Sequence, residues 1–292
     1  MPYINVDEAY ILDNTGLQVD NSVDYANANS NRNLLDNPFF TVNQRGFTSG
    51  EASAAGIKTV DRWEAIRAGV VRNSDGALTV TPSEAQYGLV QYIEPERLVV
   101  GKTYTMSANV SGTIHSGTFT LESASTSIGY FATFSDGVRF YSNYNNGRIG
   151  FWIIRSNTTP FKVYSAKLEL GSYSTLINDT PPDYGEELRK CQYYYREIKC
   201  TTTGYAMIGF ATAATAFQAC LPYTMRVRPT ITYSGTLNAY YAGGNSPVTA
   251  VAANGEFTNS IQVAFTTSGL TAGSIVALAM GSGAKLMFSA DL

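Results

Sequence analysis

The stretch Thr103-Tyr104-Thr105-Met106-Ser107-Ala108-Asn109-Val110 decides the fold class of this chain. Its even-numbered positions carry apolar side chains, and its odd-numbered positions carry polar ones. Successive side chains of a β-strand point to opposite faces, so a period of two residues is typical of a strand. The stretch therefore predicts a strand that presents one apolar and one polar face.

Similar segments lie on both sides of this strand. They are rich in β-branched and aromatic residues, and Gly, Asn, Asp or Ser clusters separate them. They span residues 60–71, 77–81, 87–93, 118–123, 129–134, 139–143, 149–154 and 161–170. About nine strands at this spacing predict a jelly roll or β-sandwich. We assign this domain to residues 33–173.

Residues 174–200 form a linker and a helix in our interpretation. Pro181-Pro182 excludes a regular element, after which Asp183 and Glu186 have the spacing of a capping box. Apolar side chains then recur every three or four residues, which predicts one face of an amphipathic helix that continues to about residue 200. These are Leu188, Cys191, Tyr194, Tyr195 and Ile198.

Strand-like segments return after Cys200. They cover residues 205–211, 216–221, 231–241, 248–252, 260–267, 274–280 and 285–290. No fixed-period repeat is visible, which argues against a propeller or solenoid. We therefore predict a second, smaller sandwich-like β-domain at residues 201–292 and an all-β chain.

The first 32 residues differ from the rest in charge. Residues 1–30 carry five acidic side chains and no Lys or Arg, whereas the whole chain has a net charge of −3. We interpret residues 1–32 as an extended attachment arm with one short strand near residues 10–12. Such a segment either stays solvated or docks on a partner.

Composition excludes several classes of function. A net charge of −3 gives no basic face for nucleic acid, and no apolar run approaches the ~18 residues of a membrane span. The N-terminus lacks the features of a signal peptide. The three cysteines and the single His show no metal-ligand spacing, so we expect reduced thiols, synthesis in a cytoplasm, no metal and no cofactor.

Four patches resemble bacteriophage tail, fibre and minor structural proteins. They follow the order and spacing of that family, and they extend over most of the chain from Asn33 to the end. The patches are Asn33–Phe40 with Asn43-Gln44-Arg45-Gly46; Asp61-Arg62-Trp63; 166–171 with 184–188 and 191–194; and the ending 284–292. The family usually has Arg where Tyr193 stands here.

The resemblance implies a jelly roll akin to carbohydrate-binding modules, a place in the virion after synthesis in the host bacterial cytoplasm, and a homo-oligomer, often a trimer. The arm before Asn33 matches nothing in the family, so we expect it to bind other virion proteins. We expect Trp63 to anchor the core and Arg62 to be buried against Asp61 or Glu64. The family's sugar-binding aromatics cannot be aligned, so no sugar site is carried over.

Residues 129–152 hold eight aromatics interleaved with Asn and Arg side chains. Sugar sites need flat apolar faces with polar donors beside them. We assign Phe131, Phe140, Phe151 and Trp152 to the core. The candidate glycan-binding residues are Tyr141, Asn143, Tyr144, Asn145 and Arg148. Tyr240 and Tyr241, which lead into a Gly-rich turn, are a second candidate.

An enzymatic function lacks its usual signals. The single His115 lies in a turn-like segment, and no two acidic residues are paired by sequence as a glycosidase requires. We expect a non-catalytic virion component, a tail fibre or tail-associated protein that binds a host receptor or glycan. The alternatives are a head fibre or capsid decoration protein without a receptor role, and a glycan depolymerase.

Overall fold

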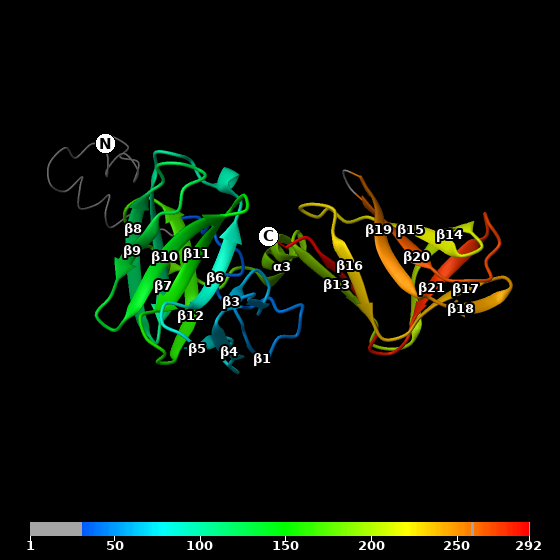
Figure 1. Cartoon of the computed structure of the whole chain (residues 1–292), viewed down its shortest axis with the longest axis horizontal. Helices are drawn as coiled ribbons and strands as arrows, with labels where there is room; N and C mark the ends of the chain where they lie inside the picture. Colours follow the sequence, from blue (N-terminus) through cyan, green and yellow to red (C-terminus); the bar gives the residue numbers. More distant parts are fainter. Residues whose placement is uncertain (1–30, 258–259, 292) are drawn as a thin grey trace, which may run out of the picture. The chain divides into compact units, whose positions relative to one another are not determined.

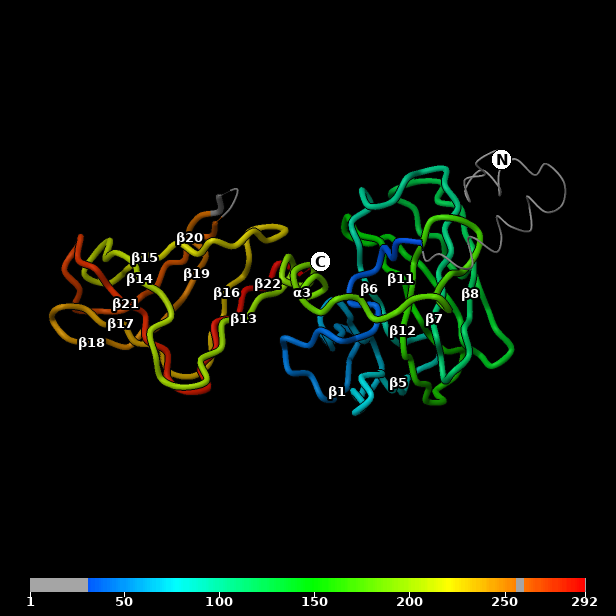
Figure 2. Tube along the Cα trace, turned by 180° about the vertical axis from the view of Figure 1, so that it is seen from behind, coloured from blue at the N-terminus to red at the C-terminus, as the bar shows by residue number. Residues whose placement is uncertain are grey.

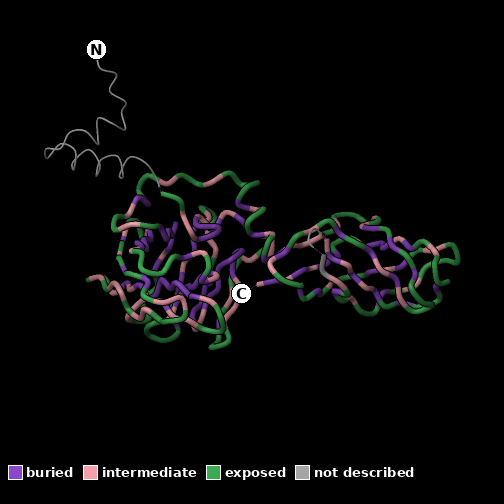
Figure 3. Tube along the Cα trace, turned by 90° about the horizontal axis from the view of Figure 1, so that it is seen from above, coloured by how far each residue is buried: buried purple, intermediate pink, exposed green. Residues whose placement is uncertain are grey.

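The computed structural model describes residues 31–257 and 260–291. This part of the chain is all-β apart from one α-helix and two short 3-10 helices. It divides into two compact units between Glu187 and Leu188, each with its own core (Figures 1 and 3). The all-β prediction is confirmed.

The first unit is a sandwich of two six-stranded antiparallel sheets. One sheet has the order β1-β4-β5-β12-β7-β8, with strands Ser49–Glu51, Ala68–Arg72, Leu78–Pro82, Phe161–Leu170, Thr103–Val110 and Thr113–Thr120. The other has the order β2-β3-β6-β11-β10-β9, with strands Ile57–Lys58, Glu64–Ile66, Gly88–Ile93, Arg148–Arg155, Val138–Asn145 and Gly129–Thr133. The short 3-10 helices are Pro95–Arg97 and Leu176–Asn178.

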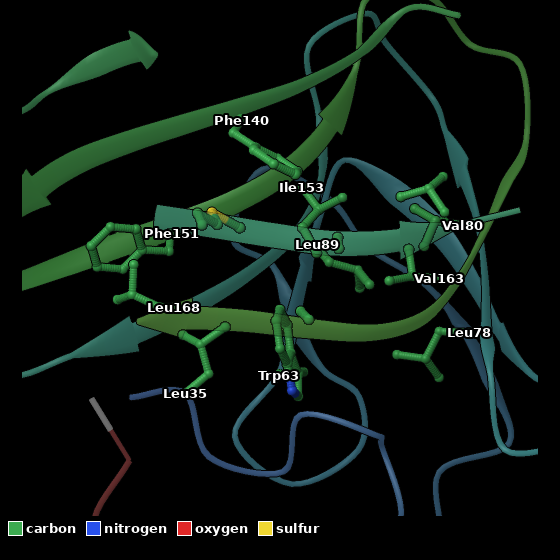
Figure 4. Close-up of a cluster of buried hydrophobic side chains, with 14 of the residues drawn as sticks. Leu35, Trp63, Leu78, Val80, Leu89, Phe140, Phe151, Ile153, Val163 and Leu168 are labelled. Carbon is green, nitrogen blue, oxygen red and sulfur yellow. The ribbon is translucent and has the colours of Figure 1, made fainter. Parts of the chain in front are cut away.

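The core of this unit lies between the two sheets. In Figure 4, Phe140 and Phe151 of one sheet and Val163 and Leu168 of the other point into the same space. Trp63 is fully buried in this cluster, which confirms its predicted role as an anchor. Each large apolar side chain buried here contributes about 1.5–3 kcal/mol to folding, so the sandwich depends on its alternating strands.

The first strand of the expected pattern differs from the prediction. Residues 60–71 do not form one strand: β3 and β4 belong to different sheets, and Arg67 between them has a φ of +45°. The predicted turn around His115 is also wrong. His115 lies within β8, whose register with β7 pairs it with Ala108, and its side chain is buried.

Three of the four sequence patches contribute to one buried polar cluster. Arg62 Nε donates to Asp36 Oδ2 at 3.1 Å, and Arg97 Nη1 donates to the same oxygen at 2.9 Å. The backbone N–H of Asn37 donates to Glu187 Oε1 at the start of the helix. The burial expected of Arg62 is observed, and its guanidinium pairs with the buried carboxylate of Asp36, a partner that the sequence did not indicate.

A second buried cluster ties down the chain after β12. Lys167 is fully buried, and its Nζ donates to Thr175 Oγ1 at 2.8 Å and to Asp179 Oδ1 at 2.6 Å. Thr175 in turn donates its backbone N–H to Glu169 Oε1 at 2.8 Å. A buried ammonium needs such partners, because an unpaired one is strongly destabilising. The polar side of β12 is thus closed by residues 175–179.

The predicted helix is shorter than its apolar pattern suggests. Helix α3 spans Tyr184–Gln192, and Asp183 Oδ1 accepts the backbone N–H of Glu186 at 3.0 Å, as a cap should. The expected continuation to residue 200 is wrong, since Tyr195–Lys199 form strand β13, which pairs with β22. Tyr and Ile favour strands, and the ladder to β22 satisfies their backbone groups.

The second unit contains a three-stranded and a seven-stranded antiparallel sheet. The smaller sheet has the order β13-β22-β16, in which β22 is Lys285–Ser289 and β16 is Thr230–Ser234. The larger has the order β18-β17-β21-β14-β15-β20-β19, with strands Gly244–Pro247, Leu237–Tyr241, Ile275–Met280, Gly204–Ala213, Ala216–Leu221, Ser260–Thr266 and Ala250–Phe257. Figure 2 shows β14 beside β21, which is distant in sequence.

Most of the predicted arm, with its expected strand at residues 10–12, lies outside the described residues. The described chain begins at Asn31, whose backbone N–H donates to Thr175 Oγ1 at 3.2 Å. Within the described ranges, no helix has the length and apolar character that a membrane crossing requires.

Candidate functional site

The outward face of the β6-β11-β10-β9 sheet carries a row of aromatic side chains. The strand register places Tyr141 of β10 opposite both Trp152 of β11 and Tyr130 of β9, while Tyr92 of β6 lies opposite Gly150. Residues that lie opposite each other share a face of the sheet. We call Tyr92, Trp152, Tyr141 and Tyr130 the aromatic row.

Each ring of the aromatic row contacts the next ring along the row. The centroids of Tyr130 and Tyr141 are 5.0 Å apart, those of Tyr141 and Trp152 6.2 Å, and those of Trp152 and Tyr92 6.4 Å. The last two pairs are edge-to-face, which is a favourable arrangement for aromatic quadrupoles. The row is therefore a packed layer on the outside of the sheet, separate from the core between the sheets.

Exposure varies along the aromatic row. Tyr130 is 48% exposed and Tyr141 is half-buried, whereas Trp152 is only 7% and Tyr92 only 6% exposed. The inner two rings support the outer two. The surface that a ligand could reach is thus centred on Tyr130 and Tyr141, at the β9 side of the sheet.

Gly150 leaves the room that this packing needs. A Cβ atom at Gly150 would lie 2.6 Å from Asn143 Oδ1, 2.8 Å from Tyr92 Cε1 and 2.9 Å from Trp152 Nε1. The same Asn143 Oδ1 accepts the indole N–H of Trp152 at 2.7 Å. Trp152 and Asn143 are therefore fixed relative to each other over a position that has no side chain.

Two arginines lie at the ends of the aromatic row. The guanidinium carbon of Arg148 is 3.9 Å from the ring centroid of Tyr92, and that of Arg139 is 5.6 Å from the centroid of Tyr130. Neither guanidinium is in an ion pair with a carboxylate among the described residues, and both Nε atoms are buried without a hydrogen-bond partner there. Cation–π contacts therefore hold two positive charges on this face without neutralising them.

Further polar groups border the row. The hydroxyl of Tyr130 donates to Gln86 Oε1, and Lys58 Nζ donates to Glu64 Oε2 at 2.8 Å. Burial raises the pKa of the Tyr92 phenol, and the charge of Glu64 raises it further, against the opposing effect of Arg148. Tyr92 is thus a neutral hydroxyl at physiological pH.

The structure separates the predicted glycan residues. Tyr141, Asn143 and Arg148 belong to the outward face, and Asn145 is exposed at the end of β10. Tyr144 is half-buried, and it packs against the core cluster instead of joining the aromatic row. Tyr144 follows Asn143 in the strand and must point to the opposite face.

Two of the four aromatic residues that we assigned to the core belong to the buried core cluster. Phe140 and Phe151 belong to the core, and Phe131 packs against it while half-buried. Trp152, although buried, lies on the outward face with the row. Sequence reasoning missed Tyr92, Tyr130, Arg139 and Gln86. Alternation along β10 places Arg139 on the face of Tyr141, but only the strand order brings Tyr92 and Gln86 near them.

The second candidate pair, Tyr240 and Tyr241, also lies on two opposite faces of its sheet. Tyr240 is exposed and contacts Tyr205 edge-to-face at 5.5 Å, on the outside of the seven-stranded sheet. Tyr241 packs against the core of its unit, and its hydroxyl lies 3.3 Å from Ser246 Oγ. The two tyrosines do not form one site.

Several titratable side chains of the first unit have partners within the fold. His115 Nε2 lies 3.1 Å from Asp136 Oδ2, and the His115 ring packs on Phe134 at 4.4 Å. Asp36 and Glu169 are engaged by Arg62 and Thr175. Within residues 31–257 and 260–291, no group of three or more His, Cys, Asp or Glu side chains could hold a metal ion.

No family model matches the sequence, and no curated protein matches it. Among solved structures, the N-terminal CBM22-1-CBM22-2 tandem domain from Paenibacillus barcinonensis is similar at 8% sequence identity and a TM-score of 0.27. The similarity covers 90% of this chain and 97% of that chain. A TM-score this low carries no argument about shared function.

Proposed function

We propose that the first unit binds carbohydrate through the exposed end of the aromatic row, and that it does so without catalysis. The observation that carries this proposal is the exposed ring of Tyr130 beside Tyr141, with the unneutralised guanidinium of Arg139 over it. Flat rings suit the C–H faces of sugars, and nearby donors suit their hydroxyl groups.

The charges on this face favour an acidic glycan. Arg139 and Arg148 have no carboxylate partner among the described residues, and planar guanidinium groups bind carboxylates and phosphates in a bidentate manner. The rings lie on four adjacent strands, which at ~4.8 Å spacing places the ends of the row ~14 Å apart. A linear oligosaccharide that crosses the strands could reach both arginines.

The place of the protein in a virion is a further part of this proposal. The four patches support it, and three of them contribute to the polar cluster around Asp36 and Asn37 that closes the first unit. In this role the chain is a tail fibre or tail-associated component that binds a host glycan. A head fibre or decoration protein would have the same fold without the binding activity.

Calorimetric titration with acidic and neutral polysaccharides of bacterial surfaces tests the binding proposal. We expect binding to the native protein, and at least tenfold weaker binding for Tyr130→Ala. Tyr173→Ala removes a ring that is 60% exposed elsewhere in the first unit and serves as the control. No binding to any glycan, or equal losses for both variants, would contradict the site.

Chromatography of the polysaccharide after incubation separates a binding protein from a depolymerase. After incubation with a polysaccharide that binds, size-exclusion chromatography should show an unchanged polymer. Shortened products would mean that the chain is an enzyme. Mass spectrometry of purified particles carrying this chain, followed by cryo-electron microscopy, would decide between a tail and a head location.

A further inference from the structure

The seven-stranded sheet of the second unit has an unusual outward face. Five large side chains on three neighbouring strands are exposed, which we call the apolar face. They are Tyr205 (69% exposed), Ile208 (69%), Phe210 (63%), Ile275 (64%) and Tyr240 (38%). Large apolar side chains are normally exposed singly in a monomer, so a group of five requires an explanation.

The strand register places these residues together. Phe210 of β14 lies opposite Ile275 of β21, and Ile208 lies opposite Ala277. Tyr240 of β17 lies opposite Ala277 on its other side, and Tyr205 contacts Tyr240 edge-to-face at 5.5 Å. Ala277 of β21 thus lies between Ile208 of β14 and Tyr240 of β17. The five large side chains share the outward face of these three strands.

This sheet is almost free of charge. Its seven strands contain a single charged residue, Glu256 in the edge strand β19. Surfaces of soluble domains usually carry roughly a quarter or more of charged side chains, which keep molecules apart. The neighbours of the apolar face on β15 and β20 are also neutral: Gln218 lies opposite both Phe210 and Ala264, and Gln262 donates to Gln218 at 2.9 Å.

We propose that a second copy of this chain covers the apolar face. A partner must offer an equally neutral and apolar surface, since a charged group placed against this face would lose its hydration without gaining a counter-charge. The chain itself carries such a surface. The exposed side chains of Tyr205, Ile208 and Phe210 of one copy have the apolar character to pack against the apolar face of another.

The size of the apolar face agrees with self-association. At the exposures given above, five side chains of ~150–250 Å² each leave on the order of 500 Å² of apolar surface in water. Standard interfaces bury about 800 Å² on each partner, of which the centre is apolar and the margin polar. The neutral amides on β15 and β20 provide that margin. Sheets that pack face to face are stable at ~10 Å separation, as in sandwiches.

The oligomeric state of the full chain tests this proposal. Light scattering coupled to size-exclusion chromatography at micromolar concentration should give at least two chains per particle. Ile208→Lys should weaken the association at least tenfold, because each copy would bring an ammonium into the apolar contact. Ile208 is 69% exposed, so the variant should fold, which circular dichroism and thermal unfolding would verify.

Ile177→Lys is the matched control, since Ile177 is 73% exposed in the first unit. It should leave the oligomer intact. A native protein that is monomeric at tens of micromolar would overturn the proposal. So would an oligomer that both variants leave unchanged, because the contact would then lie elsewhere.

The rate at which Cys220 reacts with a maleimide is an independent test of the covered face. It is exposed within one chain and lies two residues after Gln218 on the same side of β15. If a second copy covers this side, a maleimide should label Cys220 slowly in the native protein and quickly in Ile208→Lys. Peptide mapping distinguishes it from Cys191 and Cys200. Equal, fast labelling of Cys220 in both proteins would contradict a covered face.

Discussion

The indole N–H of Trp63 donates to the backbone carbonyl of Asn37, 26 positions earlier in the chain, at 3.0 Å. The side chain of Asn37 connects the segments around Val42 and Trp63, since its Nδ2 donates to the carbonyls of Val42 and Asp61, each at 2.8 Å. The patches Asn33–Phe40 and Asp61-Arg62-Trp63, which are separated along the chain, thus belong to one buried hydrogen-bond network of the first unit.

Replacing Asn37 should therefore be costly. Asn37→Ala would remove one hydrogen bond from each of the carbonyls of Val42 and Asp61 and one from the Val42 N–H. Alanine also tolerates the φ of +52° less well than asparagine does. We expect a loss of about 3 kcal/mol in the free energy of unfolding of the first unit. Urea denaturation followed by tryptophan fluorescence measures it. Asn178→Ala, at an exposed position, should change the midpoint little.

The stability of the first unit should depend on acid through Asp36. Burial alone would raise the pKa of this carboxyl, but the charges and hydrogen bonds of Arg62 and Arg97 lower it below its ordinary value. A carboxyl with a lowered pKa in the folded state stabilises the fold above its unfolded pKa of about 3.9, and this contribution disappears as the pH falls through the folded pKa.

Urea denaturation at pH 7, 5, 4 and 3 checks this expectation. The native protein should lose stability below about pH 4. Asp36→Asn should be less stable by about 3–5 kcal/mol at pH 7, because two arginines lose their counter-charge, and it should depend less on acid. Glu122→Gln, an exposed change, should follow the native curve. Parallel curves for the native and Asp36→Asn proteins would show that other groups cause the acid response.

Filling the space at Gly150 should disturb the aromatic row. The Cβ of Gly150→Ala would come within 2.9 Å of Trp152 Nε1 and closer still to Asn143 and Tyr92, so the rings must shift. Overpacking of this kind costs about 1–3 kcal/mol. We expect lower stability and weaker glycan binding together. Gly204→Ala, which meets nothing closer than 3.8 Å, should leave both unchanged.

The arginines should determine the preference for acidic glycans. Arg139→Gln and Arg148→Gln remove the charges over Tyr130 and Tyr92 but retain polar side chains. Titrations should show about tenfold weaker binding of an acidic oligosaccharide for each variant, with a reduced dependence on salt. Binding of a neutral oligosaccharide should change little. An equal loss for both ligands would assign the arginines a structural role.

Much of the fold follows from local sequence. The alternation in Thr103–Val110 correctly indicates β7, with Tyr104 and Met106 in the core. The helix after Asp183 also begins where its cap predicts. These features depend on neighbouring residues, which a single sequence contains.

The remaining errors arise from distant partners. The apolar spacing of Tyr194, Tyr195 and Ile198 fits a helix, but Tyr195 pairs with Ser289, and Glu197 accepts a bond from Lys285 at 3.0 Å. That ladder joins residues about ninety positions apart, and local periodicity contains no information about it. The aromatic row was only partly predicted for the same reason, since Tyr92 and Tyr130 reach Tyr141 and Trp152 through the strand order.

The near absence of charge in the seven-stranded sheet has a consequence for how the two units respond to their surroundings. A contact made without Asp, Glu, His, Lys or Arg side chains should persist on acidification, whereas the first unit depends on the ionised carboxyl of Asp36. Acidification below about pH 4 should therefore destabilise the first unit, and weaken its binding of ligand, while the contact through the second unit persists. Self-association through the second unit and ligand binding through the first unit would then respond differently to pH within one chain.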